Sequence, residues 1–118
     1  MMAPFDTSLL DQAIAERQAQ HEQLRQQVLQ RVLRWLEESG RRYGIDQAYI
    51  FGSVVQPGRF HAASDVDVGV EAINSVQQIE AIADLSMLLL RDVDIVDMRH
   101  CHFAHRIRER GQRWMRGN

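Results

Sequence analysis

The sequence has a single cysteine, no lysine and no long apolar run, and each of these shortages excludes a class of protein. Cys101 has no second cysteine with which to form an internal disulfide, which favours a reducing compartment such as the cytoplasm. The longest apolar run, residues 87–90, is far shorter than the roughly 20 residues of a membrane-spanning helix. The N-terminus lacks the basic and apolar regions of a signal peptide. We therefore expect a cytoplasmic protein with no membrane partner.

Positive charge is carried by arginine alone, which supplies all 14 basic residues. Arginine pairs with carboxylates and phosphates in a bidentate geometry. A GC-rich coding bias produces the same skew, and we attribute the skew to it. Because the formal net charge is −2, no long-range attraction to nucleic acid is indicated, and we expect no direct nucleic-acid partner. With 118 residues, 45% of them hydrophobic, we expect one domain over residues 1–118.

A long helix is predicted over residues 8–39, since apolar residues recur there at helical spacings and no glycine or proline interrupts the segment before Gly40. The apolar stripe is continuous from Leu24 onward, so we expect the second half of the helix to pack on the core. In the first half the stripe is interrupted, because Arg17 and His21 occupy its positions between Ile14 and Leu24. A half-polar helix gains little from burial on its own domain, so we expect the first half to project or to contact another molecule.

The rest of the chain alternates between strands and helices. Strands are predicted over residues 47–51, 66–70 and 92–98 from short apolar or alternating runs. A helix is predicted to start at Ser75, which forms a capping-box pattern with Gln78. A last helix is predicted over residues 103–115, weakened by Gly111. The order helix, strand, strand, helix, strand, helix predicts an α/β (α+β) fold in which a small β-sheet packs with helices.

Acidic residues occupy two of the predicted strands. Asp65 and Asp67 are two residues apart, so in a strand they share a face, about 7 Å apart. Two such carboxylates repel each other unless a cation lies between them, and oxygen ligands alone favour Mg²⁺. Asp94 lies in the middle of the next apolar strand. Three carboxylates from two neighbouring strands could hold two metal ions, an arrangement suited to phosphoryl or nucleotidyl transfer.

A glycine–serine pair directly follows the first predicted strand. Gly52 permits a positive φ and a close approach of the backbone. Ser53 adds a hydroxyl and a backbone N–H, and turns of this kind form concave anion sites. We therefore expect the turn to hold a triphosphate, which metal ions would bridge to the carboxylates.

Taken together, Gly-Ser, a glycine-bearing loop, Ser-Asp-Val-Asp-Val and the later Val-Asp-Ile-Val resemble the DNA polymerase β-like nucleotidyltransferase superfamily. The short chain resembles its minimal nucleotidyltransferases (MNT), the antitoxins of HEPN/MNT toxin–antitoxin modules. The resemblance covers residues 47–98. It implies a mixed sheet with helices on one face, two Mg²⁺ ions, and transfer of AMP from ATP to a tyrosine hydroxyl of a HEPN-domain RNase toxin, which the modification suppresses.

The resemblance also implies a role for each residue of the motif. Gly52 and Ser53 match the nucleotide-phosphate motif, and Asp65 and Asp67 match the two metal ligands. Asp94 matches the third carboxylate, which contacts one metal ion and helps to activate the attacking hydroxyl. All three aspartates are therefore candidates for catalysis and for metal binding.

The loop after the Gly-Ser pair departs from the family pattern. Many relatives carry Ala-Arg-Gly there, whereas this loop is one residue longer and has Gln56 in place of the usual arginine. Arg59 is our candidate for the missing phosphate contact, since its guanidinium can pair bidentately. Ser64 completes the nucleotide-binding candidates, although its position also fits a turn residue. Gly69 stands where a bulky strand residue is common, which either allows close backbone approach or loosens the strand.

Two other functions stay open. The altered loop favours an antitoxin that neutralises by contact alone, whereas the three intact carboxylates argue against it. A small-molecule nucleotidyltransferase, acting on a drug such as an aminoglycoside, usually carries an added helical domain, for which 118 residues leave no room. This alternative therefore requires that another chain supplies the helical domain. The histidines and cysteine of residues 100–105 are interpreted as a solvated loop and not as a zinc site. We expect a hetero-oligomer with the toxin, and self-association through the N-terminal helix is also open.

Overall fold

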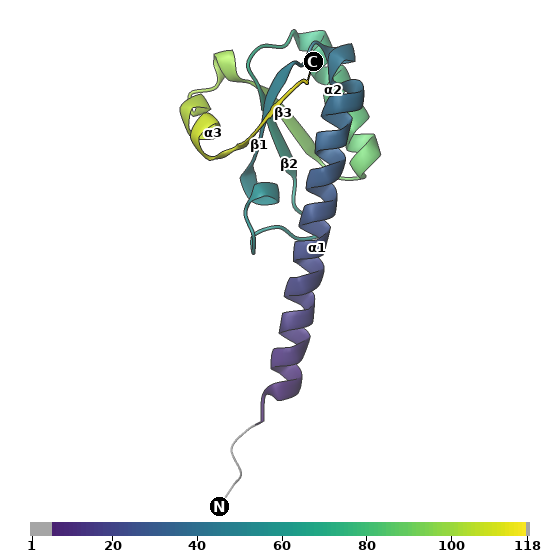
Figure 1. Ribbon diagram of the computed structural model, residues 1–118, viewed down its shortest axis with the longest axis vertical. Coiled ribbons are helices and arrows are strands. Elements are labelled where there is room, and N and C mark those ends of the chain that lie inside the picture. Colours follow the sequence, from purple (N-terminus) through teal and green to yellow (C-terminus); the bar gives the residue numbers. More distant parts are fainter. Residues whose placement is uncertain (1–5, 118) are drawn as a thin grey trace, which may run out of the picture.

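The computed structural model describes residues 6–117, with a fourth strand after the last helix (Figure 1). The elements are α1 (Ser8–Ser39), β1 (Gln47–Phe51), β2 (Val66–Val70), α2 (Ser75–Leu89), β3 (Val93–Asp97), α3 (Ala104–Arg110) and β4 (Gln112–Met115). Three short 3-10 helices lie between them: η1 (Gly40–Tyr43), η2 (Gly52–Val55) and η3 (Met98–His100). Within the described residues, no helix is both long and apolar enough to cross a membrane.

The strands form one mixed sheet in the order β3-β2-β1-β4. β1 pairs antiparallel with both of its neighbours, and β2 pairs parallel with β3. A parallel pair needs a crossover connection, and α2 supplies it. The predicted mixed α/β fold is confirmed. The strand order places the carboxyl end of β1 beside the beginnings of β2 and β3, which is where the candidate site lies.

One face of the sheet is buried by α1 and α2. Leu36 of α1 and Leu85 of α2 are fully buried in one apolar cluster, together with Ile50, Val68 and Ile95 of the strands. Because alternate residues of a strand share a face, the regularly spaced valines and isoleucines of β1, β2 and β3 supply this side of the core.

The opposite face is covered by α3. Tyr49, Met98, Ala104 and Ile107 form a second buried cluster there. Gly69 of β2 lies against it, since an added Cβ would lie 3.0 Å from Met98 Sδ and 3.2 Å from Ile107 Cγ2. Gly69 therefore allows a close approach, one of the two roles expected for it. The expectation that the helices lie on one face only is wrong, because α3 packs on the second cluster at the opposite face.

The C-terminal segment differs from the helix predicted over residues 103–115. α3 ends at Arg110, and the residues from Gln112 form β4, which pairs antiparallel with β1. Gly111 interrupts the helix with an extended conformation (φ −74°, ψ 160°). It passes so close to β1 that an added Cβ would lie 3.1 Å from the carbonyl oxygen of Ile50. Trp114 is buried as expected, but from a strand.

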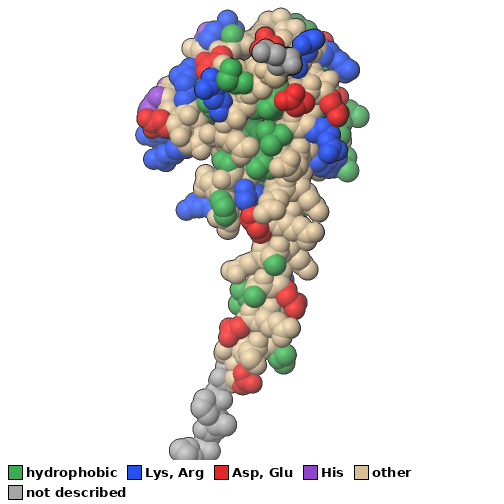
Figure 2. Space-filling model, in the orientation of Figure 1, with side chains coloured by type: hydrophobic (Ala, Val, Ile, Leu, Met, Phe, Trp, Pro, Cys, Tyr) green, Lys and Arg blue, Asp and Glu red, His purple; other side chains and the backbone are tan. Residues whose placement is uncertain are grey.

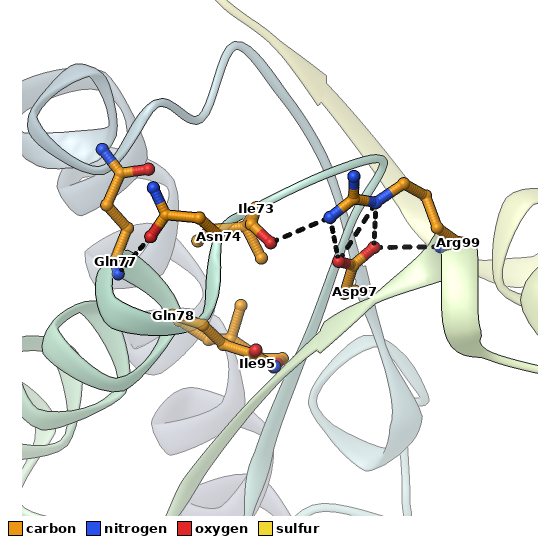
Figure 3. Close-up of polar contacts among 7 residues, drawn as sticks. All are labelled: Ile73, Asn74, Gln77, Gln78, Ile95, Asp97 and Arg99. Atoms are coloured by element: carbon orange, nitrogen blue, oxygen red, sulfur yellow. Dashed lines mark hydrogen bonds and ion pairs between the residues drawn. The ribbon is translucent and has the colours of Figure 1, made fainter.

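α2 begins at Ser75, as predicted, but the residue that caps its N-terminus differs from the prediction. Asn74 is the N-cap residue, and its Oδ1 accepts a hydrogen bond from the Gln77 N–H at 2.8 Å (Figure 3). The side chain of Gln78 instead donates to the Ile95 carbonyl at 2.7 Å. The predicted capping box of Ser75 and Gln78 is therefore wrong, since Gln78 is used to hold the outer edge of β3.

α1 extends well beyond the domain on which it packs. Residues 8–20, which we call the arm, are exposed on all sides, and burial begins at His21. The molecule measures 70 × 28 × 26 Å, and its Cα radius of gyration is 18.0 Å, compared with about 13–14 Å for a compact chain of this length. Figure 1 shows the arm leaving at the end of the sheet where η2 and the following loop lie. The first half of the helix thus projects, as expected.

Candidate active site

The carboxyl end of β1 meets the beginnings of β2 and β3 at one edge of the sheet. In the register of the sheet, Phe51 stands opposite Asp67, and Asp67 stands opposite Asp94. Gly52 directly follows Phe51 and begins η2, in which Ser53 is the second residue. The structure therefore brings the Gly-Ser turn together with two of the predicted carboxylates.

Gly52 lies directly against the carboxylate of Asp67. Its φ is +79°, and an added Cβ would lie 2.5 Å from Asp67 Oδ2. Both features require glycine, because other residues rarely adopt a positive φ and no Cβ fits at this distance. A phosphate bound by the N–H groups of this turn would consequently lie next to the Asp67 carboxylate.

The carboxylates of the site repel one another. Burial raises the pKa of Asp67, and the negative charges of Asp94 and Asp65 raise it further. No hydrogen-bond donor within residues 6–117 offsets this shift. The Asp67 side chain is half-buried, whereas Asp65 and Asp94 are exposed. The structure thus assembles negative charge at this edge without a positive partner for Asp67 in the described part of the chain.

The loop between η2 and β2 carries the other two nucleotide-binding candidates. Arg59 lies on the exposed side of the loop, and its backbone N–H donates to the Gln56 carbonyl at 3.1 Å. Ser64 is buried, and its hydroxyl accepts a hydrogen bond from the backbone N–H of His61 at 3.0 Å. The hydroxyl of Ser64 is therefore engaged within the loop, as the turn interpretation expects.

Comparison with known proteins shows which family shares this arrangement. A family model described as "Polymerase beta, Nucleotidyltransferase" matches residues 36–115. The chain belongs to this nucleotidyltransferase family. A solved structure described as "Crystal structure of the toxin-antitoxin with AMP-PNP" is similar, with 26% identity over 71% of this chain and 70% of that chain and a TM-score of 0.57. A search of curated proteins found no match. The superfamily predicted from the motif is confirmed.

The nucleotidyltransferase site suits a divalent cation by its donor atoms. Asp65, Asp67 and Asp94 offer carboxylate oxygens, the ligands that Mg²⁺ prefers, and a cation among them would offset the repulsion that raises the pKa of Asp67. As they stand, no three His, Cys, Asp or Glu side chains within residues 6–117 are gathered closely enough to hold an ion. Because Asp65 and Asp94 are exposed, rotation of their side chains could bring their oxygens toward Asp67.

Arg91, which the sequence analysis missed, lies beside the predicted metal ligands of the nucleotidyltransferase. Its guanidinium donates to the Ser64 carbonyl at 2.7 Å and lies 4.8 Å from the centroid of the Phe60 ring. Burial lowers the pKa of Arg91, whereas the negative charge of Asp65 raises it, so Asp65 is near. No local pattern could reveal this role, since the two hydrogen-bonded residues are 27 positions apart in the chain.

A cavity of about 650 Å³ opens beside Asp94, along the outer edge of β3. β3, the start of α2 and residues 99–103 line it, and Figure 3 shows part of this wall. Arg99 donates to the Ile73 carbonyl at 3.1 Å and also to Asp97, which holds the pKa of Asp97 at about 2.

Residues 100–102, expected to form a solvated loop, line this cavity too. The nucleotidyltransferase therefore has an open hollow next to its third predicted carboxylate.

Proposed function

We propose that this nucleotidyltransferase transfers AMP from ATP to a tyrosine hydroxyl of a HEPN-type RNase toxin and so acts as its antitoxin. The observation that carries the proposal is the contact of Gly52 with the Asp67 carboxylate, beside Asp94. It joins a turn suited to phosphate with a carboxylate suited to a metal ion. The similar solved structure supports the proposal, since it is a toxin–antitoxin with AMP-PNP, an analogue of ATP.

The role of each residue follows from its position. The N–H groups and the hydroxyl of the turn formed by Gly52 and Ser53 would bind the phosphate oxygens. Asp65 and Asp67 would hold Mg²⁺, which when bound neutralises the triphosphate and stabilises the departing pyrophosphate. A carboxylate oxygen of Asp94, exposed at the cavity, would help to hold the metal and would accept the proton of the tyrosine hydroxyl as its oxygen attacks the α-phosphorus.

Label transfer tests the proposed reaction. The protein is incubated with ATP labelled at the α-phosphate and with the purified product of the adjacent gene, in Mg²⁺ or in EDTA. We expect label on the partner in Mg²⁺ alone, and none when its acceptor tyrosine is changed to phenylalanine. A partner that is neutralised without becoming labelled would show instead an antitoxin that acts by contact.

Ser53→Ala should weaken binding of ATP with Mg²⁺ roughly ten- to a hundredfold, because a hydrogen bond to a charged group contributes about 1.5–3 kcal/mol. Ser64→Ala is the matched control, since its hydroxyl accepts from the His61 N–H within the loop and its loss should mainly lower the thermal midpoint. Calorimetric titration with ATP and Mg²⁺ measures both affinities. Equal losses at the two positions would show that the turn at Ser53 does not bind the phosphates.

The arm of α1 is the surface that we assign to the toxin. Leu9, Leu10 and Ile14 are 82%, 57% and 48% exposed, and Figure 2 shows apolar and acidic side chains interspersed along this projecting half. Leu10 and Ile14 continue the helical stripe that packs on the core from Leu24 onward. A helical segment of this length is marginal in water without a partner. Association of two copies through the arm is the alternative outcome.

Deleting residues 1–20 should preserve the folded core and the binding of ATP with Mg²⁺, yet weaken assembly. The arm buries almost nothing on its own domain, so its removal costs the domain little free energy of unfolding. Size-exclusion chromatography with light scattering, on the protein alone and with its partner, measures the assembly.

Two single substitutions sharpen this experiment. Ile14→Glu places a charge on the apolar stripe of the arm, whereas Ala15→Glu places the same charge on its other side. Only the first should reduce assembly. If the truncated protein forms the same complexes with unchanged affinity, the arm has no role in assembly.

A further inference from the structure

The backbone around Asp65 is held on both sides by consecutive residues of the segment that joins α2 to β3. Arg91 Nη1 donates a hydrogen bond to the Ser64 carbonyl at 2.7 Å. The N–H of Val66 donates to the Asp92 carbonyl at 3.0 Å. These two bonds flank Asp65 in the chain, so its backbone cannot shift without breaking one of them.

Arg91 also holds the loop that leads to Asp65. Its guanidinium lies 4.8 Å from the centroid of the Phe60 ring, which is itself buried, at 3% exposure. A cation over an aromatic face at this distance is attracted by the ring. A longer contact of 3.5 Å joins Arg91 Nη1 to the His61 carbonyl. One side chain thus contacts the loop at three residues, Phe60, His61 and Ser64.

Two unfavourable features accompany this placement. Leu90 adopts the left-handed conformation (φ 54°, ψ 44°), the one non-glycine residue with a positive φ in the described part of the chain. Its side chain is 88% exposed, so burial does not compensate for the strain. Arg91 Nε is buried without a hydrogen-bond partner within residues 6–117, which also opposes folding. The left-handed turn at Leu90 is the C-cap of α2, where its N–H donates to the Ser86 carbonyl at 2.8 Å. It ends the helix directly before Arg91.

We propose that Arg91 is a positioning residue for Asp65. By binding the Ser64 carbonyl and the Phe60 ring, it fixes the loop so that the Asp65 carboxylate joins Asp67 around the metal ions. The inference rests on the proposed metal-dependent function and assigns no bond-making step to Arg91.

Arg91→Met tests the proposal, since methionine keeps an apolar stem but removes the donors and the charge. ATP binding is titrated calorimetrically at a series of Mg²⁺ concentrations and in EDTA. We expect the Mg²⁺ concentration for half-maximal binding to rise about tenfold or more, the usual effect of losing a residue that orients a metal ligand. ATP binding in EDTA should not change. Amide hydrogen exchange over residues 61–66 should become faster.

Arg116→Met is the matched control. Arg116 Nη2 donates to the Ile45 carbonyl at 2.6 Å, and its guanidinium lies 5.4 Å from the centroid of the Trp114 ring. The substitution therefore removes the same kinds of contact near the start of β1, at the opposite end of the sheet from Gly52. It should lower the thermal midpoint and leave the Mg²⁺ requirement unchanged.

If Arg91→Met behaves like this control, Arg91 is structural and the proposal is wrong. Arg91→Lys decides the matter should Arg91→Met fail to fold, because lysine restores the charge but not the planar fork. A persistent Mg²⁺ defect in Arg91→Lys supports positioning, and complete recovery overturns it. If the wild type does not bind ATP with Mg²⁺, the proposed function is wrong. Hydrogen exchange over residues 61–66 in Arg91→Met still tests whether Arg91 holds the loop.

Discussion

Gly52→Ala is expected to lower the rate of nucleotidyl transfer by roughly a hundredfold or more, since a displacement of about 1 Å at a reacting site has an effect of that size. The new Cβ would lie 2.5 Å from Asp67 Oδ2, so the carboxylate must turn away from the phosphate turn. The φ of +79° adds backbone strain of about 1–2 kcal/mol. Label transfer and the thermal midpoint measure the two effects separately.

Gly58→Ala separates strain from displacement of the carboxylate. Gly58 also has a positive φ, +85°, but an added Cβ would meet nothing within 4 Å. Its substitution should therefore lower the thermal midpoint while most of the transfer activity is retained. Equal losses of activity in Gly52→Ala and Gly58→Ala would show that the contact of Gly52 with Asp67 has no part in the reaction.

Asp67→Asn should abolish detectable transfer while the fold is preserved. Metal ions contribute several kcal/mol to stabilising charge in the transition state, so loss of a ligand is expected to cost roughly a thousandfold in rate. Asp46→Asn is the control, because Asp46 is an exposed carboxylate at the opposite end of the sheet. Label transfer from ATP in Mg²⁺ compares the two variants, and undiminished transfer by Asp67→Asn would remove Asp67 from the site.

The same Asp67→Asn variant should be more stable than the wild type at pH 7 in EDTA. The pKa of Asp67 is raised above its ordinary value of 3.8 in the folded protein. At a pH between 3.8 and this raised pKa, the folded state therefore binds more protons than the unfolded state. The contribution of Asp67 to the free energy of unfolding therefore falls as the pH rises through this window. At every pH above the window, including pH 7, the ionised Asp67 continues to lower the stability of the folded protein. The neutral amide of the variant carries no such penalty. Thermal unfolding should show a higher midpoint for the variant in EDTA, and Mg²⁺ should raise the midpoint of the wild type alone.

Much of the candidate site could be predicted because its signals are local. Gly52 and Ser53 follow an apolar strand, and Asp65 and Asp67 alternate with valines, so residue type and spacing identify them without knowledge of distant contacts. The predicted bounds of the first helix, residues 8–39, agree with α1 for the same reason, since its apolar residues recur at helical spacing within one continuous segment. Gly40 itself keeps right-handed helical angles and begins η1, and the left-handed turn comes at Gly44. Local signals of this kind identify elements and candidate residues, but not their neighbours.

The C-terminal segment shows where local signals fail. Ile107 and Trp114 lie at a spacing that a continuous helix would also produce, so periodicity could not separate α3 from β4. The strand forms because residues from Gln112 onward find the free edge of β1, far earlier in the chain. Pairing between distant segments depends on which backbone edges remain open after the core has formed, and no window of neighbouring residues contains that information.

By itself, the sequence determined the types of element, the residues that carry charge and phosphate-binding capacity, and the half-polar character of the arm. Only the tertiary structure decided that Gly52 lies against the Asp67 carboxylate and that Arg91 binds the loop before Asp65. It also decided that the arm leaves at the same end of the sheet as the site. The reason is physical. Helical and strand periodicity arises from residues within a few positions of each other, whereas these contacts arise when burial of one apolar core brings distant segments into register.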